Sequence, residues 1–470
     1  MLNKAFKYAF AISGVLGTLI GILSTWLTAQ TLTVPPIQQT QGKKGTVLFF
    51  INEEYGLTNV HLDTAQALLE HHPSVTIHVA SFPEATKRGI GNLARAMPIF
   101  ALPWSAEDHL NIYHAAMQVL LRVDPAVVVL DTYMTPAIDA TRQANYVHTI
   151  IESNSMIHAF YLAQPYWSMF WKYPMLGTGF TYPVPWRQIP ENIYVTARLV
   201  YSFLFDPHAR EKRKYLQEHG IANPASYNLH RPDVPWFTRT MFDAGVRPEV
   251  VPANVTGVGP IILGVAPAIE QDLELVEWLS KTRTVLVNLG TLFTHNEERA
   301  TVMAEALEIL LLEHTKVQVL WKLQKCTDFP DDFARSLKEY GDRIRITEWL
   351  AADPLALLET GHIVASANHG GSSCFHEAIA AGVPQIIIPF WTDLYDFART
   401  AEDSDIGVFA TKDTAPQWTV EGLSEAFLRV VHGKESSRMR KNTRRLSAIA
   451  KKNRGRYVTA REIAKLAGST

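Results

Sequence analysis

The sequence has 470 residues, of which 47% are hydrophobic and 19% charged, and its formal net charge is −2. This balance excludes the basic surface expected of a nucleic-acid-binding protein, and the length predicts two domains of roughly 200 residues each. The two cysteines, Cys326 and Cys374, are too few for a disulfide framework, and no Cys/His cluster has the spacing of a metal site.

The first 35 residues differ from the rest of the chain. Residues 8–32 form an almost continuous apolar run without a charged side chain, and a bilayer core requires about 20 such residues. We therefore expect a membrane anchor and its flank over residues 1–35, in a single-pass protein of the endoplasmic reticulum or another endomembrane. The alternatives are a cleaved signal peptide, which has a shorter apolar region, and a buried helix.

Strand and helix patterns alternate after this segment. The apolar runs 45–52, 75–81 and 126–130 are typical of buried parallel strands, and residues 59–70 have helical periodicity. The same rhythm returns later in the chain, with strands expected at 284–289, 317–321, 363–366 and 385–388. The fold class is therefore α/β, with two Rossmann-like, doubly wound domains behind an N-terminal transmembrane helix.

Composition also places the domain borders. We expect an N-terminal domain over 36–247, a linker rich in proline and glycine over 248–267, and a C-terminal domain over 268–470. Residues 160–245 are aromatic and irregular, which predicts a packed core, an apolar acceptor pocket or a membrane-facing surface. Two doubly wound domains that face each other form a cleft at the carboxyl ends of their sheets, where ligands bind.

One glycine-rich turn carries the strongest chemical signal. It follows the expected strand 363–366, contains His369, Gly370 and Gly371, and leads into a helix. The glycines let a ligand approach the backbone, and the start of the helix offers free N–H groups, a combination that holds a diphosphate without a metal. Glu377 lies two turns into this helix, where its carboxylate can accept hydrogen bonds from ribose hydroxyls.

This segment resembles a known donor-binding signature. The residues from His369 to Glu377, then Ala381-Gly382-Val383-Pro384 and Pro389-Phe390-Trp391-Thr392-Asp393, resemble the signature of family 1 UDP-glycosyltransferases. The run Asp393-Leu394-Tyr395-Asp396-Phe397-Ala398 is most similar to filamentous-fungal members. Further matches are Val255-x-x-Val258-Gly259-Pro260, Leu289-Gly290-Thr291 and Trp321-Lys322. The resemblance implies the arrangement of two domains called GT-B, in which the N-terminal domain binds the acceptor and the C-terminal domain binds the nucleotide sugar.

The resemblance also implies contacts with the nucleotide sugar. These contacts, from base to sugar, are stacking on uracil by Trp349, ribose binding by Glu377, diphosphate binding by His369, Gly371, Ser373, Cys374, Gly290 and Thr291, and sugar binding by Trp391 and Asp393. Ser373 and Cys374 stand where plant members usually have Asn-Ser, so the hydroxyl–phosphate contact becomes at best a weak thiol contact, for which Ser372 or Ser373 can compensate. Leu394 replaces the Gln that normally follows the sugar-binding Asp, which leaves the identity of the sugar open.

The catalytic base is matched less closely. The family usually places a His after a Gly in the first strand–helix loop, with an Asp at the end of a later strand. Asp131 fits the second position, but an ungapped match sets Leu57 at the first, and His61 lies one helical turn further along the same face. We expect His61 to be the base and Asp131 its orienting partner; the alternative is that His61 only lines the pocket.

These observations predict an inverting hexosyltransferase. It would use a UDP-sugar as co-substrate, without a metal or other cofactor, and glycosylate a hydroxyl of a small lipophilic acceptor such as a secondary metabolite or sterol. One alternative is a GDP- or dTDP-deoxysugar donor. The other is a catalytically silent, membrane-anchored binding subunit, which Leu57 and Leu394 favour and the presence of Asp131, Glu377 and Asp393 disfavours.

Two surface features remain. Asn254-Val255-Thr256 is the only N-glycosylation sequon of the chain, so Asn254 would carry a glycan if the body of the protein is lumenal. The basic run from Lys434 to Arg456 is expected to be a solvated helix face, with contact to anionic lipid as the alternative.

Overall fold

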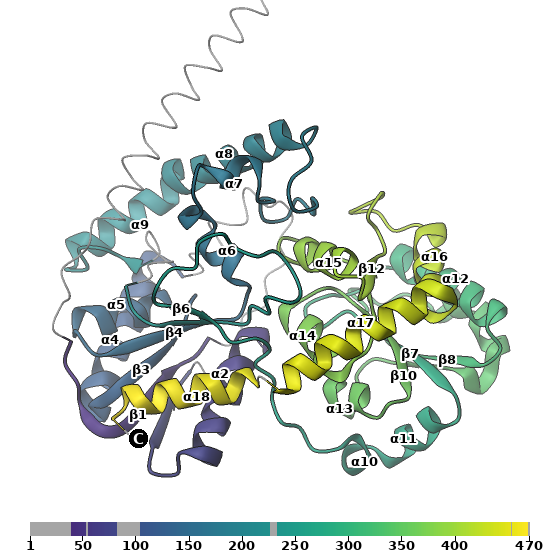
Figure 1. Ribbon diagram of the computed structural model, residues 1–470, viewed down its shortest axis with the longest axis horizontal. Helices are drawn as coiled ribbons and strands as arrows, with labels where there is room; N and C mark the ends of the chain where they lie inside the picture. Colours follow the sequence, from purple (N-terminus) through teal and green to yellow (C-terminus); the bar gives the residue numbers. More distant parts are fainter. Residues whose placement is uncertain (1–38, 53–54, 82–103, 226–232, 453, 469–470) are drawn as a thin grey trace, which may run out of the picture.

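The computed structural model describes residues 39–52, 55–81, 104–225, 233–452 and 454–468, which form two α/β domains, each on a parallel sheet (Figure 1). The expected membrane span, residues 8–32, lies outside the described residues and stays a prediction. Among the helices of the described ranges, none combines the length and the apolar character needed to cross a bilayer.

The N-terminal sheet has the order β2-β1-β3-β4-β5-β6, and all neighbouring strands are parallel. Its strands are β1 (Lys43–Phe50), β2 (Thr76–Ala80), β3 (Pro125–Asp131), β4 (His148–Glu152), β5 (Trp236–Thr238) and β6 (Val255–Gly257). The central strand β3 is buried along its whole length, as expected for a strand with helices on both faces of its sheet. In the register of β3 and β4, Asp131 lies opposite Ile151. The carboxyl ends of these strands, with Asp131 and Glu152, therefore share one edge of the sheet.

Helices cover both faces of this sheet. They are α2 (Tyr55–His71), α4 (Ala106–Val123), α5 (Thr135–Gln143), α6 (Met156–Phe160), α7 (Ser168–Trp171), α8 (Ile189–Phe205) and α9 (Pro207–Glu218). One apolar core joins the sheet to α4 and α5, and a second joins its other face to α2. The residue at the start of α4 shows why the helix begins there: Ser105 accepts a hydrogen bond from the Asp108 N–H and satisfies one of the free donors of the first turn.

The C-terminal sheet repeats the plan, with the order β12-β11-β10-β7-β8-β9 and parallel neighbours throughout. Its strands are β7 (Arg283–Asn288), β8 (Val317–Lys322), β9 (Ile344–Thr347), β10 (Ile363–Asn368), β11 (Gln385–Ile387) and β12 (Gly407–Phe409). Its helices are α10 (Ala268–Gln271), α11 (Leu273–Ser280), α12 (Glu297–Glu313), α13 (Pro354–Glu359), α14 (Ser372–Ala381), α15 (Leu394–Asp403), α16 (Val420–Val431) and α17 (Gly433–Lys452).

The observed domain borders differ from the expected ones in two places. The strand β6 lies inside the expected linker 248–267 and pairs with β5 at the edge of the N-terminal sheet. The last helix, α18 (Gly455–Leu466), packs on α2, because Ala460 and Ile463 complete the apolar core on that face (Figure 1). The chain therefore crosses between the domains twice. The basic run lies mostly on α17, which buries Met439 and Leu446 and exposes most of its basic side chains.

Candidate active site between the two domains

The turn between β10 and α14 brings backbone donors to the interdomain face. Gly370 has a φ of +85°, and a Cβ there would lie 2.7 Å from the Ile387 side chain, so only glycine fits. The Gly370 N–H donates to Asn368 Oδ1 at 2.8 Å. In the described part of the chain no side chain caps α14, whose N-cap is Gly371. A helix N-terminus without a side-chain cap is a typical binding site for an anion.

His369 is fixed beside this helix. Its ring stacks on Phe390, with centroids 5.9 Å apart and planes 24° apart. A Cβ on Gly290 would lie 2.7 Å from His369 Cε1, and one on Gly371 would overlap Nε2, so the two glycines make room for the imidazole. Burial, aided by the Lys322 cation, lowers the pKa of His369 to about 4. At neutral pH the ring is therefore a neutral hydrogen-bonding group.

The loop after β7 faces the same turn. Gly290 has a φ of +84° and donates its N–H to Asn288 Oδ1 at 3.1 Å, while Lys322 Nζ donates to Gly290 O at 3.0 Å. Thr291 is exposed. The same Lys322 ammonium lies 3.9 Å from the centre of the Trp349 ring, and 57% of Trp349 is exposed. Lys322 therefore contacts both the loop at Gly290 and the ring of Trp349.

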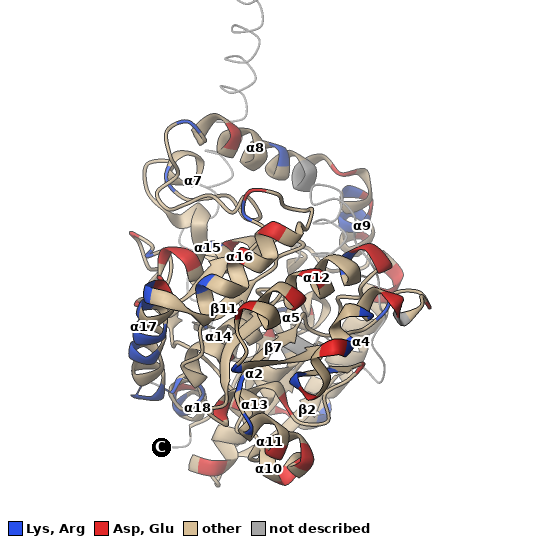
Figure 2. Cartoon of the chain, turned by 90° about the vertical axis from the view of Figure 1, so that its right-hand side faces the viewer, with Lys and Arg blue, Asp and Glu red and all other residues tan. Residues whose placement is uncertain are grey.

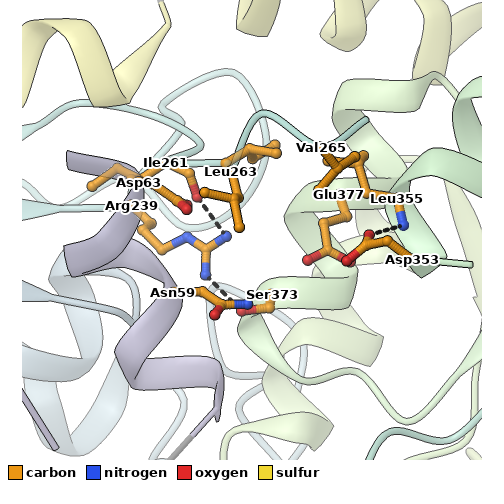
Figure 3. Close-up of a pocket in the computed structure, with 11 residues that line it drawn as sticks. Asn59, Asp63, Arg239, Ile261, Leu263, Val265, Asp353, Leu355, Ser373 and Glu377 are labelled. Atoms are coloured by element: carbon orange, nitrogen blue, oxygen red, sulfur yellow. Dashed lines mark hydrogen bonds between the residues drawn. The ribbon is translucent and has the colours of Figure 1, made fainter. Parts of the chain in front are cut away.

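A polar cavity lies between the domains (Figure 3). It lies between α2 on one side and the starts of α13 and α14 on the other. Its lining comprises Asn59, Asp63, Arg239, Ile261, Ile262, Leu263, Val265, Asp353, Leu355, Ser373 and Glu377. Ser373 and Glu377 are four residues apart on α14, so both expected donor-site side chains point to the face that borders the cavity.

Arg239 is the only cation of this lining and is almost fully buried, at 1% exposure. It follows β5 in the N-terminal domain, and its Nη1 donates to Ser373 Oγ in the other domain at 3.1 Å (Figure 3). Its Nη2 donates to Ile261 O at 3.0 Å. Within the described structure its buried Nε has no hydrogen-bond partner. A buried guanidinium is thus held beside the donor-site helix with donor capacity to spare.

The carboxyl groups of the cavity respond to burial and to Arg239. Burial raises the pKa of Glu377 to about 7; Asp353 adds to this shift and Arg239 opposes it. Burial likewise raises the pKa of Asp63 to about 8, against the opposing charge of Arg239 and with a contribution from Glu377. The Arg239 cation therefore opposes the effect of burial on both carboxyl groups. At neutral pH Asp63 is protonated, and Glu377 is about half ionised.

The expected sugar-binding residues lie at the start of α15. Asp393 is the N-cap residue of that helix and accepts a hydrogen bond from Thr392 Oγ1 at 2.6 Å. Burial raises the pKa of Asp393, and Glu152 in the N-terminal domain adds to the shift. Trp391 is partly buried in the same turn. Asp393 thus lies within electrostatic range of the carboxyl edge of the N-terminal sheet.

Asp396, from the run 393–398 that resembles fungal members, makes contacts between the two domains. Asp396 Oδ2 accepts the Gly177 N–H at 3.2 Å and lies 3.5 Å from His158 Nε2. Arg399 Nε donates to Gly179 O at 2.9 Å. These contacts join α15 to the loop after α7, so the second Asp of the run has an interdomain structural partner.

The expected base and its partner meet inside the N-terminal domain. His61 lies on α2 and Asp131 ends β3, and His61 Nδ1 is 3.9 Å from Asp131 Oδ2. Asp131 Oδ1 accepts the Tyr133 N–H at 2.8 Å, which fixes the carboxylate. His61 has no exposed surface, so an acceptor hydroxyl reaches the ring only after neighbouring side chains move. The side chain of Leu57 lies outside those that the structure describes.

Other expected features are placed as follows. Asn254 is exposed immediately before β6, where its carbonyl accepts the Trp236 N–H at 2.8 Å; its glycosylation stays a prediction. Cys374 Sγ lies 3.3 Å from Asn368 Oδ1 and 3.7 Å from His369 Nδ1. Burial raises the pKa of this thiol to about 12, so Cys374 is a neutral group in the site. Over the residues that the structure describes, no group of His, Cys, Asp and Glu has the geometry of a metal site.

Sequence reasoning missed two basic residues of the site. Arg239 follows a three-residue strand, belongs to no motif and meets Ser373 from 134 positions away. Lys322 was part of the matched Trp321-Lys322 pair but was given no role, although it contacts both Gly290 and Trp349. The resemblance of the Trp321-Lys322 pair to the family could have pointed to Lys322. No local sequence pattern points to Arg239.

Comparisons with known proteins identify the family of the chain. The family model described as "UDP-glucoronosyl and UDP-glucosyl transferase" matches residues 195–455. Glycosyltransferase sdnJ of Sordaria araneosa is 30% identical over 460 residues, which cover 84% of this chain and 89% of that protein. The 2-hydroxyacylsphingosine 1-beta-galactosyltransferase of Homo sapiens is 26% identical over 317 residues, 61% of this chain and 53% of that protein.

Solved structures share the fold. The UDP-glucosyltransferase from Polygonum tinctorium capable of glucosylating indoxyl superposes with a TM-score of 0.63 at 17% sequence identity, covering 92% of this chain and all of that one. The two parallel-sheet domains thus have the GT-B fold. The chain belongs to the UDP-glucoronosyl and UDP-glucosyl transferase family, and it is a hexosyltransferase. The predicted family and enzyme class are therefore confirmed.

Proposed function

We propose that this enzyme transfers a hexose from a UDP-sugar to a hydroxyl of a small lipophilic acceptor, with inversion at the anomeric carbon. The observation that carries the proposal is the uncapped start of α14, with His369, Ser373 and Arg239 gathered around it. The human relative is named for a sphingosine derivative, and the Polygonum enzyme is described as glucosylating indoxyl. Both names support an apolar acceptor.

In this proposal the UDP-sugar lies between Trp349, which contacts the base, and Asp393, which contacts the sugar. Uracil stacks on the exposed indole, whose platform Lys322 steadies. The ribose hydroxyls donate to Glu377, and the diphosphate lies between the N–H groups of α14 and the loop at Gly290 and Thr291. Asp393, with Trp391 beside it, accepts hydrogen bonds from the hydroxyls of the sugar.

Arg239 adds a positive charge from the facing domain. Its guanidinium donates to Ser373, whose hydroxyl is expected to compensate for the phosphate contact that Cys374 weakens. A phosphate oxygen beside Ser373 would satisfy the remaining Nε donor of Arg239, and a charge-assisted hydrogen bond of this kind is roughly twice as strong as a neutral one. Closure of the domains and binding of the donor would then stabilise each other.

The transfer step follows from these positions. The acceptor hydroxyl gives its proton to His61, and its oxygen forms a bond to the anomeric carbon from the face opposite UDP. The bond from that carbon to the diphosphate oxygen breaks, and the electron pair leaves with UDP, whose charge the α14 N–H groups and Arg239 stabilise. Asp131 stabilises the imidazolium that forms. The acceptor attacks once, so the configuration is inverted.

The same groups account for the proposed independence from a metal. The N-terminus of α14 carries a partial positive charge, and Arg239 a full one, on the site where the leaving group gains charge. Neutral His369 contributes a hydrogen bond. No cofactor other than the UDP-sugar co-substrate is proposed.

We also propose that residues 8–32 anchor the enzyme in an endomembrane, since this run is uncharged and of bilayer length. Deletion of residues 1–34 is expected to move the protein from the membrane pellet to the supernatant, with UDP affinity retained. A truncated protein that stays in the pellet at high salt would contradict the anchor. An endoglycosidase shift that disappears in Asn254→Gln would place the body in the lumen.

The function is tested by incubating the full chain with lipophilic alcohols and phenols and a panel of UDP-, GDP- and dTDP-sugars. We expect UDP release that depends on acceptor, only with UDP-hexoses, and a product whose anomeric coupling shows inversion. A deoxysugar nucleotide turned over in preference to every UDP-hexose would contradict the proposed donor.

A further inference from the structure

The helix α8 presents a stripe of exposed residues along one side. Positions 191, 194, 198, 201 and 205 recur at alternating intervals of three and four, which places them on one helical face. All five are exposed, and they are Glu191, Tyr194, Arg198, Tyr201 and Phe205. Three of the five are therefore aromatic, although no part of the described protein covers them.

The exposed aromatic area extends beyond the stripe. The exposed fractions are 62% for Tyr194, 58% for Tyr201 and 39% for Phe205, and the rings of Tyr201 and Phe205 stack with centroids 4.8 Å apart. Trp186, just before α8, is 75% exposed, and the Arg187 guanidinium lies 5.2 Å from its ring centre. Large aromatic side chains that are exposed next to one another are typical of an interaction site.

The neighbouring helix α7 and the two residues before it add three more rings. Tyr166 is 85% exposed, Trp171 45% and Trp167 38%, and Trp171 Nε1 donates to Tyr166 O at 3.0 Å. α7 packs against α8, and in both views the pair forms the outer end of the N-terminal domain, away from the sheets (Figures 1 and 2). We call this set the α7–α8 surface: Tyr166, Trp167, Trp171, Trp186, Tyr194, Tyr201 and Phe205.

The chemistry of this surface fits lipid headgroups better than a protein. Trp and Tyr are the residues that gather where a membrane meets water, because their rings are apolar and their tips polar. Basic residues outnumber acidic ones two to one from Trp186 to Lys214. Arg198 lies within the stripe, and Arg210, Arg213 and Lys214 are exposed on the adjoining α9. Aromatic side chains with arginine and lysine around them are the pattern of an interfacial helix on anionic lipid.

The tether to the predicted anchor is short. Residues 33–38 are all that separates the apolar run 8–32 from the described body, and six extended residues reach about 20 Å. A body held that close to a bilayer meets it repeatedly. The exposed aromatic rings and arginines, however, stand as evidence independent of this tether.

We propose that the α7–α8 surface lies on the headgroup region of an anionic bilayer and forms a second membrane contact, separate from residues 8–32. This contact fixes the N-terminal domain, the expected acceptor-binding domain, against the lipid in which an apolar acceptor dissolves. The inference does not depend on the catalytic roles of His61 or Asp131.

The test places a fluorophore on this surface in the full chain. Cys326→Ser removes the exposed native thiol, and Cys374 takes little label because burial raises its pKa to about 12. Tyr194→Cys and Tyr201→Cys supply labelling positions, and Leu312→Cys on α12, 68% exposed, is the matched control in the other domain. Each labelled protein is reconstituted in vesicles of phosphatidylcholine with a minority of phosphatidylserine and checked for UDP-sugar turnover.

Two quenchers then report the location of each label. We expect nitroxide lipids to quench positions 194 and 201 severalfold more than position 312, and aqueous iodide to do the reverse. Equal iodide quenching at all three positions would overturn the proposal. Shielding from iodide without nitroxide quenching, especially if it is lost on dilution of the protein, would assign the surface to a second copy and overturn it as well.

Discussion

His61 and Asp131 give the sharpest prediction about the reaction. The two side chains are buried and 3.9 Å apart. At an effective dielectric constant of ~20, a full imidazolium at that distance from a carboxylate gains about 4 kcal/mol. If roughly half of the proton charge has reached the ring in the transition state, Asp131 contributes about 2 kcal/mol, which corresponds to about 30-fold in turnover.

The expected losses follow in order. His61→Ala should lower kcat by about 10²–10⁴-fold, the usual contribution of a general base. Asp131→Asn should lower it by about 30-fold, since asparagine removes the charge. It keeps an oxygen for the Tyr133 N–H bond. The double variant should be no slower than His61→Ala alone, because the residues act as one unit. Turnover is measured by UDP release at saturating donor and acceptor, and UDP affinity should stay unchanged.

A second buried pair in the same domain provides the control. His109 and Asp139 lie 2.9 Å apart between α4 and α5, outside the residues proposed for the reaction. Asp139→Asn should lower the melting temperature and leave the kcat of the folded enzyme unchanged. If His61→Ala costs less than about threefold, or if the losses from His61→Ala and Asp131→Asn simply multiply, the reasoning about this pair is refuted.

Three further predictions concern the donor side. Arg239→Gln should weaken UDP binding by about 1.5–3 kcal/mol, the value of a charge-assisted hydrogen bond; an unchanged Kd by calorimetry would leave Arg239 a purely structural role. Turnover should persist in EDTA, and activity that returns only with added magnesium would contradict metal-independent departure of UDP. Asp63 and Glu377 have folded-state pKa values of about 8 and about 7. At pH values between the ordinary pKa values of these carboxyl groups and the raised ones, the folded protein binds more protons than the unfolded chain. The melting temperature without donor should therefore fall as the pH rises from about 5 to 8, and Asp63→Asn should flatten that decline. Over the same range UDP binding should tighten as Glu377 ionises.

The sequence carried enough information for the sheets and the donor helix. A strand that is covered on both faces needs apolar side chains at every position, so its sequence is a short run without polar alternation. Residues 126–130 form such a run, and β3 is buried throughout. The Gly370-Gly371 turn marks the end of a strand and the start of a helix, so His369 and Glu377 could be placed by counting residues. Local rules of this kind predicted the N-terminus of α14 well.

Features that depend on distant partners could not be predicted. The strand β6 has three residues inside a segment rich in proline and glycine, and it exists because β5 offers an open edge. The helix α18 belongs to the N-terminal domain because its apolar face completes the core beside α2. Arg239 meets Ser373 only once both domains are assembled. In each case the deciding interaction joins segments far apart in the chain, beyond the reach of local pattern.

The measurement that bears most directly on the donor site is calorimetric binding of UDP to the full chain and to Glu377→Ala. Because the Glu377 carboxylate is proposed to hold the ribose, the substitution should weaken binding by about 1.5–3 kcal/mol, or roughly 10- to 150-fold in Kd. Glu305→Ala, on the exposed side of α12 in the same domain, should bind UDP like the unaltered protein. A Glu377→Ala protein that is folded and binds UDP with unchanged Kd would contradict the assignment of α14 to the nucleotide.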